Sequence, residues 1–247
     1  MKILTLIITL CLFVQTGYAQ IYNVTGTDLK INVPDGYYSA TRAVIDPQAL
    51  ELFNQSKELL LKNMKENNIY FESFNPKTNI GFTITVIENE TTKKIFDFRE
   101  HPDIINQPEY KKAYKENQKK VFNITIDFFG DYSNHSALYS VTSGFQYMNN
   151  TKFHIQRYST VRQGKAISVT LFGLYDDKAN IEKESLLITN NLIYPQSQPP
   201  PTPPSKPSFG GKALYKGITG GLSALLIMCF WLIGKYIWNK LKNRSCD

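Results

Sequence analysis

The side chains best suited to acid–base or metal chemistry in this 247-residue sequence are three histidines and a few carboxylates. His101, His135 and His154 are far apart, and none belongs to an H-x-x-x-H or H-E-x-x-H pattern. Asp127 and Asp131 could meet His135 at a loop and form a polar or metal cluster. Lone histidines are more often solvated or structural, so we predict no metal site.

Signatures of known catalytic sites are also missing. The sequence has no G-x-S-x-G elbow, Walker loop or Rossmann fingerprint. Its three cysteines are Cys11, Cys229 and Cys246, so residues 20–195 contain no thiol nucleophile, thiolate metal site or disulfide. We therefore predict no catalytic residue and no cofactor, with a hydrolase of unrecognised type as the alternative.

Two of the polar groups have expected structural places. His154 alternates with Phe153 and Ile155, so it should lie on a strand and face away from the core. Asp176 and Asp177 precede an apolar helical pattern and are expected to cap that helix. Both interpretations leave these residues without a chemical role.

The elements that would position these residues follow from hydrophobic periodicity. Alternation predicts strands at 28–33, 82–86, 122–128, 139–147, 153–161 and 166–174, the last three joined by hairpins at Asn149-Asn150 and at residues 162–165. Helical spacing predicts one helix from Asp46-Pro47 to Asn67-Asn68. Two further helices are expected at 108–120 and about 178–191.

We therefore expect an α+β fold: a single domain with about three helices on a mostly antiparallel sheet, plus one C-terminal transmembrane helix. A first strand running into Val33-Pro34-Asp35-Gly36-Tyr37, then a long helix, meandering strands and a closing helix, resembles the PsbP-like fold family. The resemblance covers roughly residues 27–194. It implies a binding or assembly module and offers no catalytic set.

The first 19 residues are typical of a secretory signal peptide. A basic start at Lys2 precedes an apolar region too short to span a membrane, and Gly17 and Ala19 provide small residues before a cleavage site. We predict cleavage between Ala19 and Gln20, with a retained N-terminal anchor as the alternative. Residues 20–195 would then form an exported domain.

Residues 217–234, GITGGLSALLIMCFWLIG, contain no charge. An apolar run of about 20 residues matches a hydrocarbon core about 30 Å thick, so we expect a transmembrane helix within 212–238. Its basic membrane flank should be cytoplasmic, together with the tail at 239–247. That flank consists of Lys235, Lys240, Lys242 and Arg244.

Small residues begin the same run. Gly217 and Gly221 are four positions apart and could form a face that packs on another membrane helix, although glycines are also common near helix ends. Residues 196–211 precede the run and are rich in proline, which favours an extended stalk.

The formal net charge of +7 does not indicate a nucleic-acid partner, because residues 20–195 contain 20 basic and 20 acidic residues. The surplus lies near the membrane segments. Five lysines crowd the helix predicted at 108–120. They are explained by a solvated face supported by a Glu116–Lys120 pair, or by contact with anionic lipid or an acidic partner. Those lysines are Lys111, Lys112, Lys115, Lys119 and Lys120.

These observations favour a single-pass binding or assembly module at the plasma (inner) membrane of a bacterium, with its domain outside the cytoplasm. The expected partners are the membrane and another membrane protein, and no nucleic acid. A membrane-tethered hydrolase and an accessory subunit of a larger membrane complex remain as alternatives.

Overall fold

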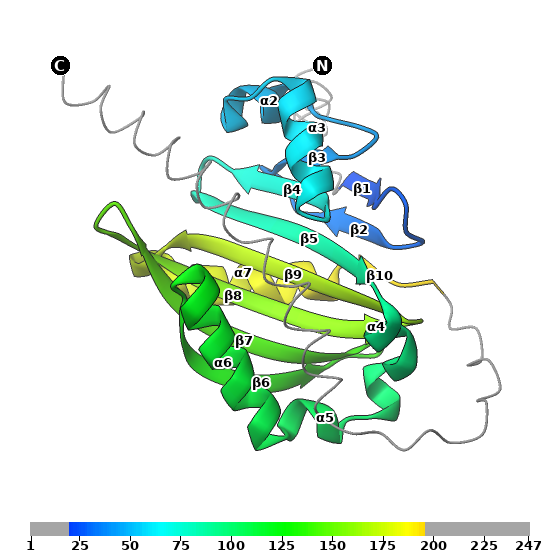
Figure 1. Cartoon of the computed structure of the whole chain (residues 1–247). Helices are drawn as coiled ribbons and strands as arrows, with labels where there is room; N and C mark the ends of the chain where they lie inside the picture. Colours follow the sequence, from blue (N-terminus) through cyan, green and yellow to red (C-terminus); the bar gives the residue numbers. More distant parts are fainter. Residues whose placement is uncertain (1–19, 196–247) are drawn as a thin grey trace, which may run out of the picture.

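The computed structural model describes residues 20–195, which form two antiparallel sheets and six α-helices (Figure 1). The larger sheet has seven strands in the order β3-β4-β5-β9-β8-β7-β6, and every neighbouring pair is antiparallel. The strands are β3 (Tyr38–Thr41), β4 (Ile69–Asn75), β5 (Ile80–Glu88), β6 (Thr125–Ser133), β7 (Leu138–Met148), β8 (Thr151–Arg162) and β9 (Lys165–Leu174). The prediction of an α+β fold with a mostly antiparallel sheet is confirmed.

The smaller sheet has three strands in the order β1-β2-β10. They are β1 (Gln20–Asn23), β2 (Lys30–Val33) and β10 (Leu192–Ile193). The first and last strands of the described region therefore both pair with β2. Ile31 and Leu192 of this sheet pack with Phe82 and Val169 of the larger sheet in the main hydrophobic core.

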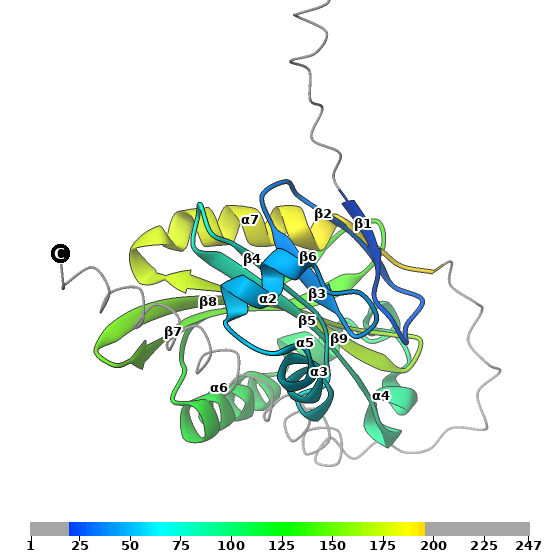
Figure 2. The ribbon, with the colours of Figure 1, turned by 90° about the horizontal axis from the view of Figure 1, so that it is seen from above.

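Helices cover both faces of the larger sheet (Figure 2). They are α2 (Pro47–Phe53), α3 (Lys57–Glu66), α4 (Glu90–Ile95), α5 (Asp103–Asn106), α6 (Pro108–Phe122) and α7 (Lys178–Asn190). Ile181 and Ile188 of α7 belong to the main core, so α7 and the small sheet cover the same face, which we name the α7 face. The opposite face, which we name the α6 face, is contacted by α3 at β4 and by α6 at β6.

The single helix predicted from Asp46 to Asn68 is two helices in the structure. Asn54 ends α2 in the left-handed conformation, with φ of 48°. Ser56 then begins α3, because its side chain accepts a hydrogen bond from the backbone N–H of Leu59. Asparagine tolerates the left-handed region and serine is a favoured N-cap, so this break is encoded locally.

The predicted hairpins are confirmed at both turns. Asn149 and Asn150 both have positive φ, as the two central residues of a tight hairpin turn require, and they join β7 to β8. Gln163 and Gly164 have the same property and join β8 to β9. Helices α6 and α7 confirm the later two predicted helices, whereas α4 and α5 were not predicted.

Several predictions fall outside the described residues. They concern cleavage after Ala19, the helix at 212–238, its Gly217 and Gly221, and the membrane flank from Lys235 to Arg244. Among residues 20–195, no helix combines the length and the hydropathy that a membrane span needs.

Candidate functional site

The three histidines stay apart in the structure. His101 and His135 are exposed, and His154 is fully buried. Within residues 20–195, no group of three or more His, Cys, Asp or Glu side chains could hold a metal ion. Asp127, Asp131 and His135 therefore do not assemble the metal cluster that their spacing could have formed.

His154 does not face away from the core, as its position between Phe153 and Ile155 predicted. Its side chain lies on the α7 face with no solvent exposure, whereas Phe153 and Ile155 lie on the α6 face. The alternation of side chains was correct, but α7 covers the face that was expected to be solvated. Burial, together with the nearby Lys178, lowers the pKa of the imidazole to about 4.

Ser143 and Glu182 lie next to His154 but do not form a catalytic triad with it. The Ser143 Oγ is 3.5 Å from His154 Nε2, and the Glu182 Oε1 is 3.8 Å from the same nitrogen. A triad needs the nucleophile and the acid on opposite ring nitrogens. Ser143 is also only 2% exposed, so its hydroxyl cannot meet a substrate in this conformation.

Asp176 and Asp177 lie in a short 3₁₀ turn (Tyr175–Asp177) that leads into α7. Asp177 is the N-cap residue by position, but its side chain makes no capping hydrogen bond. The predicted side-chain cap is therefore wrong: Asp177 occupies the N-cap position without bonding the helix, because the 3₁₀ turn continues directly into α7.

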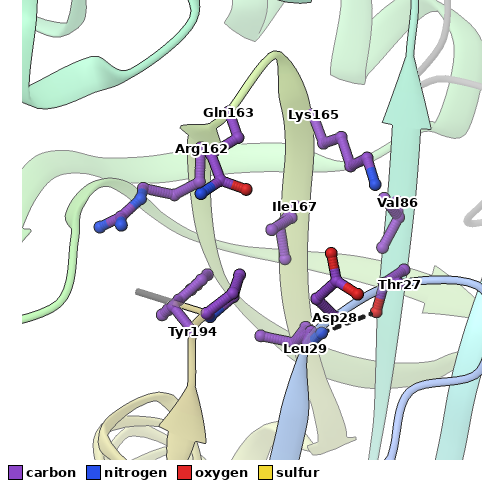
Figure 3. Close-up of a pocket in the computed structure, with 10 residues that line it drawn as sticks. Thr27, Asp28, Leu29, Val86, Arg162, Gln163, Lys165, Ile167 and Tyr194 are labelled. Carbon is purple, nitrogen blue, oxygen red and sulfur yellow. Dashed lines mark hydrogen bonds between the residues drawn. The ribbon is translucent and has the colours of Figure 1, made fainter. Parts of the chain in front are cut away.

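A small cavity lies between the turn before β2 and the β8–β9 hairpin (Figure 3). Its volume of about 30 Å³ has room for one or two water molecules but not for a metabolite. The lining residues are Thr27, Asp28, Leu29, Val86, Arg162, Gln163, Lys165, Ile167, Tyr194 and Pro195. The sequence predicts only a turn at residues 162–165, because the other walls of the cavity come from distant segments.

An ion-pair cluster lies beside this cavity. Asp97 Oδ2 is 2.8 Å from Arg99 Nη2 and 3.2 Å from Arg162 Nε. The Arg162 guanidinium carbon is 5.3 Å from the centre of the Tyr194 ring, whose hydroxyl is 2.9 Å from that of Tyr139. These contacts fix the last described residues to the hairpin, so the cluster has an evident structural role.

A second group of polar residues crosses the α6 face in register. Glu72, Thr83, Thr170 and Arg157 occupy successive strands β4, β5, β9 and β8. Arg157 donates hydrogen bonds to Thr170 Oγ1 at 3.1 Å and to the Tyr114 hydroxyl at 2.9 Å. Burial raises the pKa of Glu72 to about 7. A single glutamate between Phe71 and Ser73 gave no sequence signal for this.

The lysines of α6 form a charged cluster on the surface of the domain. Lys112, Lys115, Lys119 and Lys120 are exposed, and Lys111 is half-buried. The predicted pair between Glu116 and Lys120 is not among the ion pairs within 4 Å in residues 20–195. The interpretation of these lysines as a solvated face therefore loses the Glu116–Lys120 ion pair that was expected to support it.

No family model matches this chain, and no curated protein matches it in sequence. Among solved structures, it is similar to PsbP (CyanoP) of Synechocystis sp. PCC 6803, with 11% identity, a TM-score of 0.47, and coverage of 71% of this chain and 91% of that one. It is also similar to LpqN of Mycobacterium tuberculosis, described as involved in cell envelope biogenesis, with 10% identity, a TM-score of 0.40, and coverage of 66% and 81%. The solved structures thus also show the PsbP-like resemblance that the sequence showed, as a likeness in fold alone.

Proposed function

We propose that this chain is a membrane-anchored, extracytoplasmic binding or assembly module. The observation that carries the proposal is the place of the domain's two ends. Gln20 lies in β1 and Ile193 in β10, and both strands pair with β2. A domain whose ends share one small sheet can be held from that side while its other surfaces remain free for a partner.

The sequence supplies the anchor in this proposal. The uncharged run at 217–234 is long enough to cross a bilayer, and the proline-rich residues 196–211 separate it from the domain. The proposed face at Gly217 and Gly221 would let a second membrane helix approach closely, as in an accessory subunit of a complex.

The buried chemistry favours binding over hydrolysis. His154 and Ser143 are 0% and 2% exposed, and the cavity beside Arg162 is too small for a substrate. Lys112, Lys115 and Lys120 of α6, in contrast, are exposed and can contact another surface. A contact surface on a tethered domain is therefore the function that the described residues support best.

A topology experiment tests this proposal. A tag after Asp247 should resist protease added to cells whose outer barrier is permeable, while the domain is digested. Replacing Leu225 and Leu226 by Arg should release the protein from the membrane fraction, because each charge near the centre of a span costs about 3 kcal/mol. Replacing the same pair by Ala is the matched control and should keep the protein in the membrane.

Cleavage of the tag from outside in intact cells would contradict the orientation. Recovery of the double-Arg variant in the membrane fraction at the wild-type level would show that the apolar run is not the anchor.

A further inference from the structure

The buried side chains of α6 fix which side of the helix faces the sheet. Tyr110, Tyr114 and Gln118 are 7%, 3% and 1% exposed. The rings of Tyr110 and Tyr114 meet the Phe129 ring edge to face, at 5.9 and 5.5 Å. The Tyr114 hydroxyl also accepts a hydrogen bond from Arg157. The outward side of α6 is consequently fixed relative to the sheet.

Next to that buried side, α6 carries a row of lysines along the flank that faces β6. Lys111, Lys115 and Lys119 are spaced four residues apart, which places them in one stripe along a helix. Lys111 donates a hydrogen bond to Asn106, and Lys119 donates one to Thr125 of β6, both at 3.2 Å. The row therefore runs beside the β6 edge of the sheet. We name these three residues the α6 row.

Helix α6 carries five lysines and two glutamates, so its own net charge is +3. None of the ion pairs within 4 Å in residues 20–195 includes a lysine of α6. Lysines four residues apart repel one another and destabilise a helix. The domain as a whole has equal numbers of basic and acidic residues, so the row is a local concentration of positive charge.

We propose that the α6 row docks on anionic phospholipid headgroups of the membrane that anchors the chain. This inference rests on the function proposed above. The α6 helix contains lysines and no arginine. Lysine acts as a mobile point charge, whereas arginine favours fixed bidentate partners. A row of charges along a helix on the outside of the sheet (Figure 2) also fits a plane of charged headgroups better than a concave site.

Tethering makes a weak contact sufficient. The 16 residues at 196–211 would span at most about 50 Å in the extended polyproline conformation. The row is therefore held close to the bilayer, and its contact with the headgroups becomes intramolecular, with a high effective concentration. Each lysine near an anionic surface strengthens the attraction about fivefold.

Lysine footprinting on the full chain tests the proposal. The purified chain is mixed with vesicles of phosphatidylcholine alone or with added phosphatidylglycerol, and flotation records membrane binding. A membrane-impermeant amine reagent then acetylates exposed lysines, and mass spectrometry gives the rate at each site. We expect several-fold slower acetylation of Lys112 and Lys120 on anionic vesicles, and recovery at high salt because screening shortens the range of charge.

Variants separate the row from general charge. With Lys111, Lys115 and Lys119 replaced by Gln, Lys112 and Lys120 should react at equal rates on both vesicles. The same three positions replaced by Arg should retain the protection, because charge is kept.

A matched control removes the same charge elsewhere. Lys30, Lys77 and Lys183 are exposed and lie off α6. Replacing them by Gln should leave the protection of Lys112 and Lys120 unchanged.

The outcomes distinguish this inference from the proposed function. Flotation with both vesicles, but equal acetylation on both, would overturn lipid docking in favour of an acidic protein surface and leave the anchor intact. Flotation with anionic vesicles alone, abolished in the triple Gln variant, would support the row and overturn the anchor. Flotation with neither vesicle would overturn both.

Discussion

In the central strands of the seven-stranded sheet, both faces are buried, but they differ chemically. On the α7 face, the central strands present aromatic and aliphatic side chains such as Phe71, Phe82 and Val169, each fully buried. On the α6 face, the same strands present polar side chains such as Thr83 and Thr170, which are at most 5% exposed. The difference shows that strict alternation along a strand does not by itself identify a solvated face.

Each face also buries a group whose shifted pKa lies between about 4 and about 7, with opposite consequences for pH. Glu72 on the α6 face has a pKa raised to about 7, and His154 on the α7 face has a pKa lowered to about 4. Burial disfavours the charged form in both cases, so the carboxyl keeps its proton and the imidazole stays without one. Substitutions on either face of the sheet can test this contrast between the α6 face and the α7 face.

The largest expected effect is the loss of an aromatic ring from the α7 face. Phe82→Ala should lower the free energy of unfolding by about 3–5 kcal/mol, because Phe82 packs against Tyr37 and Phe71. Thr83→Ala, one residue away on the other face, should cost about 1 kcal/mol. Denaturation of the full chain in detergent measures both, and equal costs would refute the contrast between the faces.

The next effect is a pH dependence from Glu72. Between about 4.5 and about 7, the unfolded chain has lost the proton that the folded chain keeps, so stability should fall as pH rises through this window. Glu72→Gln should remove this loss, which amounts to about 3 kcal/mol above pH 7. The measurement is the free energy of unfolding at a series of pH values.

Glu51 on α2 provides the matched control, because it is exposed. Glu51→Gln should leave the pH dependence unchanged. An unaltered slope in the Glu72 variant would mean that the carboxyl is ionised in the fold at neutral pH.

A smaller effect of opposite sign is expected from His154. Between about 6.5 and about 4, the unfolded imidazole gains a proton that the folded one does not, so stability should fall as pH falls. The loss should be about 2 kcal/mol, since Glu182 lies near enough to offset part of the cost of charging the ring. His154→Phe should abolish it in the same titration.

Because the two windows overlap, the slopes should nearly cancel in the wild type between about pH 4.5 and 6.5. Each single variant should therefore reveal a slope that the wild type hides. A wild-type profile as steep as that of either variant would contradict this balance.

The sequence predicted the strands and hairpins of the late sheet because local rules set them. Alternation fixes which residues share a face, and Asn149-Asn150 and Gln163-Gly164 adopt the positive φ that tight turns need. The place of His154 could not be predicted in this way. Its burial depends on α7 crossing that face, which is a tertiary fact absent from the strand itself.

The cavity and the polar row were missed for a related reason. Thr27, Val86, Arg162 and Tyr194 meet only because four separate segments converge. Glu72 is unusual only once the covering of its face is known. The lysines of α6 were visible in the sequence, but their lack of ion-pair partners within residues 20–195 required the structure.

The shortness of β10 has a mechanical consequence for a tethered domain. Tension from an anchor beyond Pro195 would enter the domain through β10, which pairs with β2 at only two positions. The next resistance is Tyr194, held by Tyr139 and packed near Arg162. Releasing these few residues would lengthen the tether by about 10 Å while the seven-stranded sheet stays intact. Strand β10 would thus yield under load before the seven-stranded sheet does.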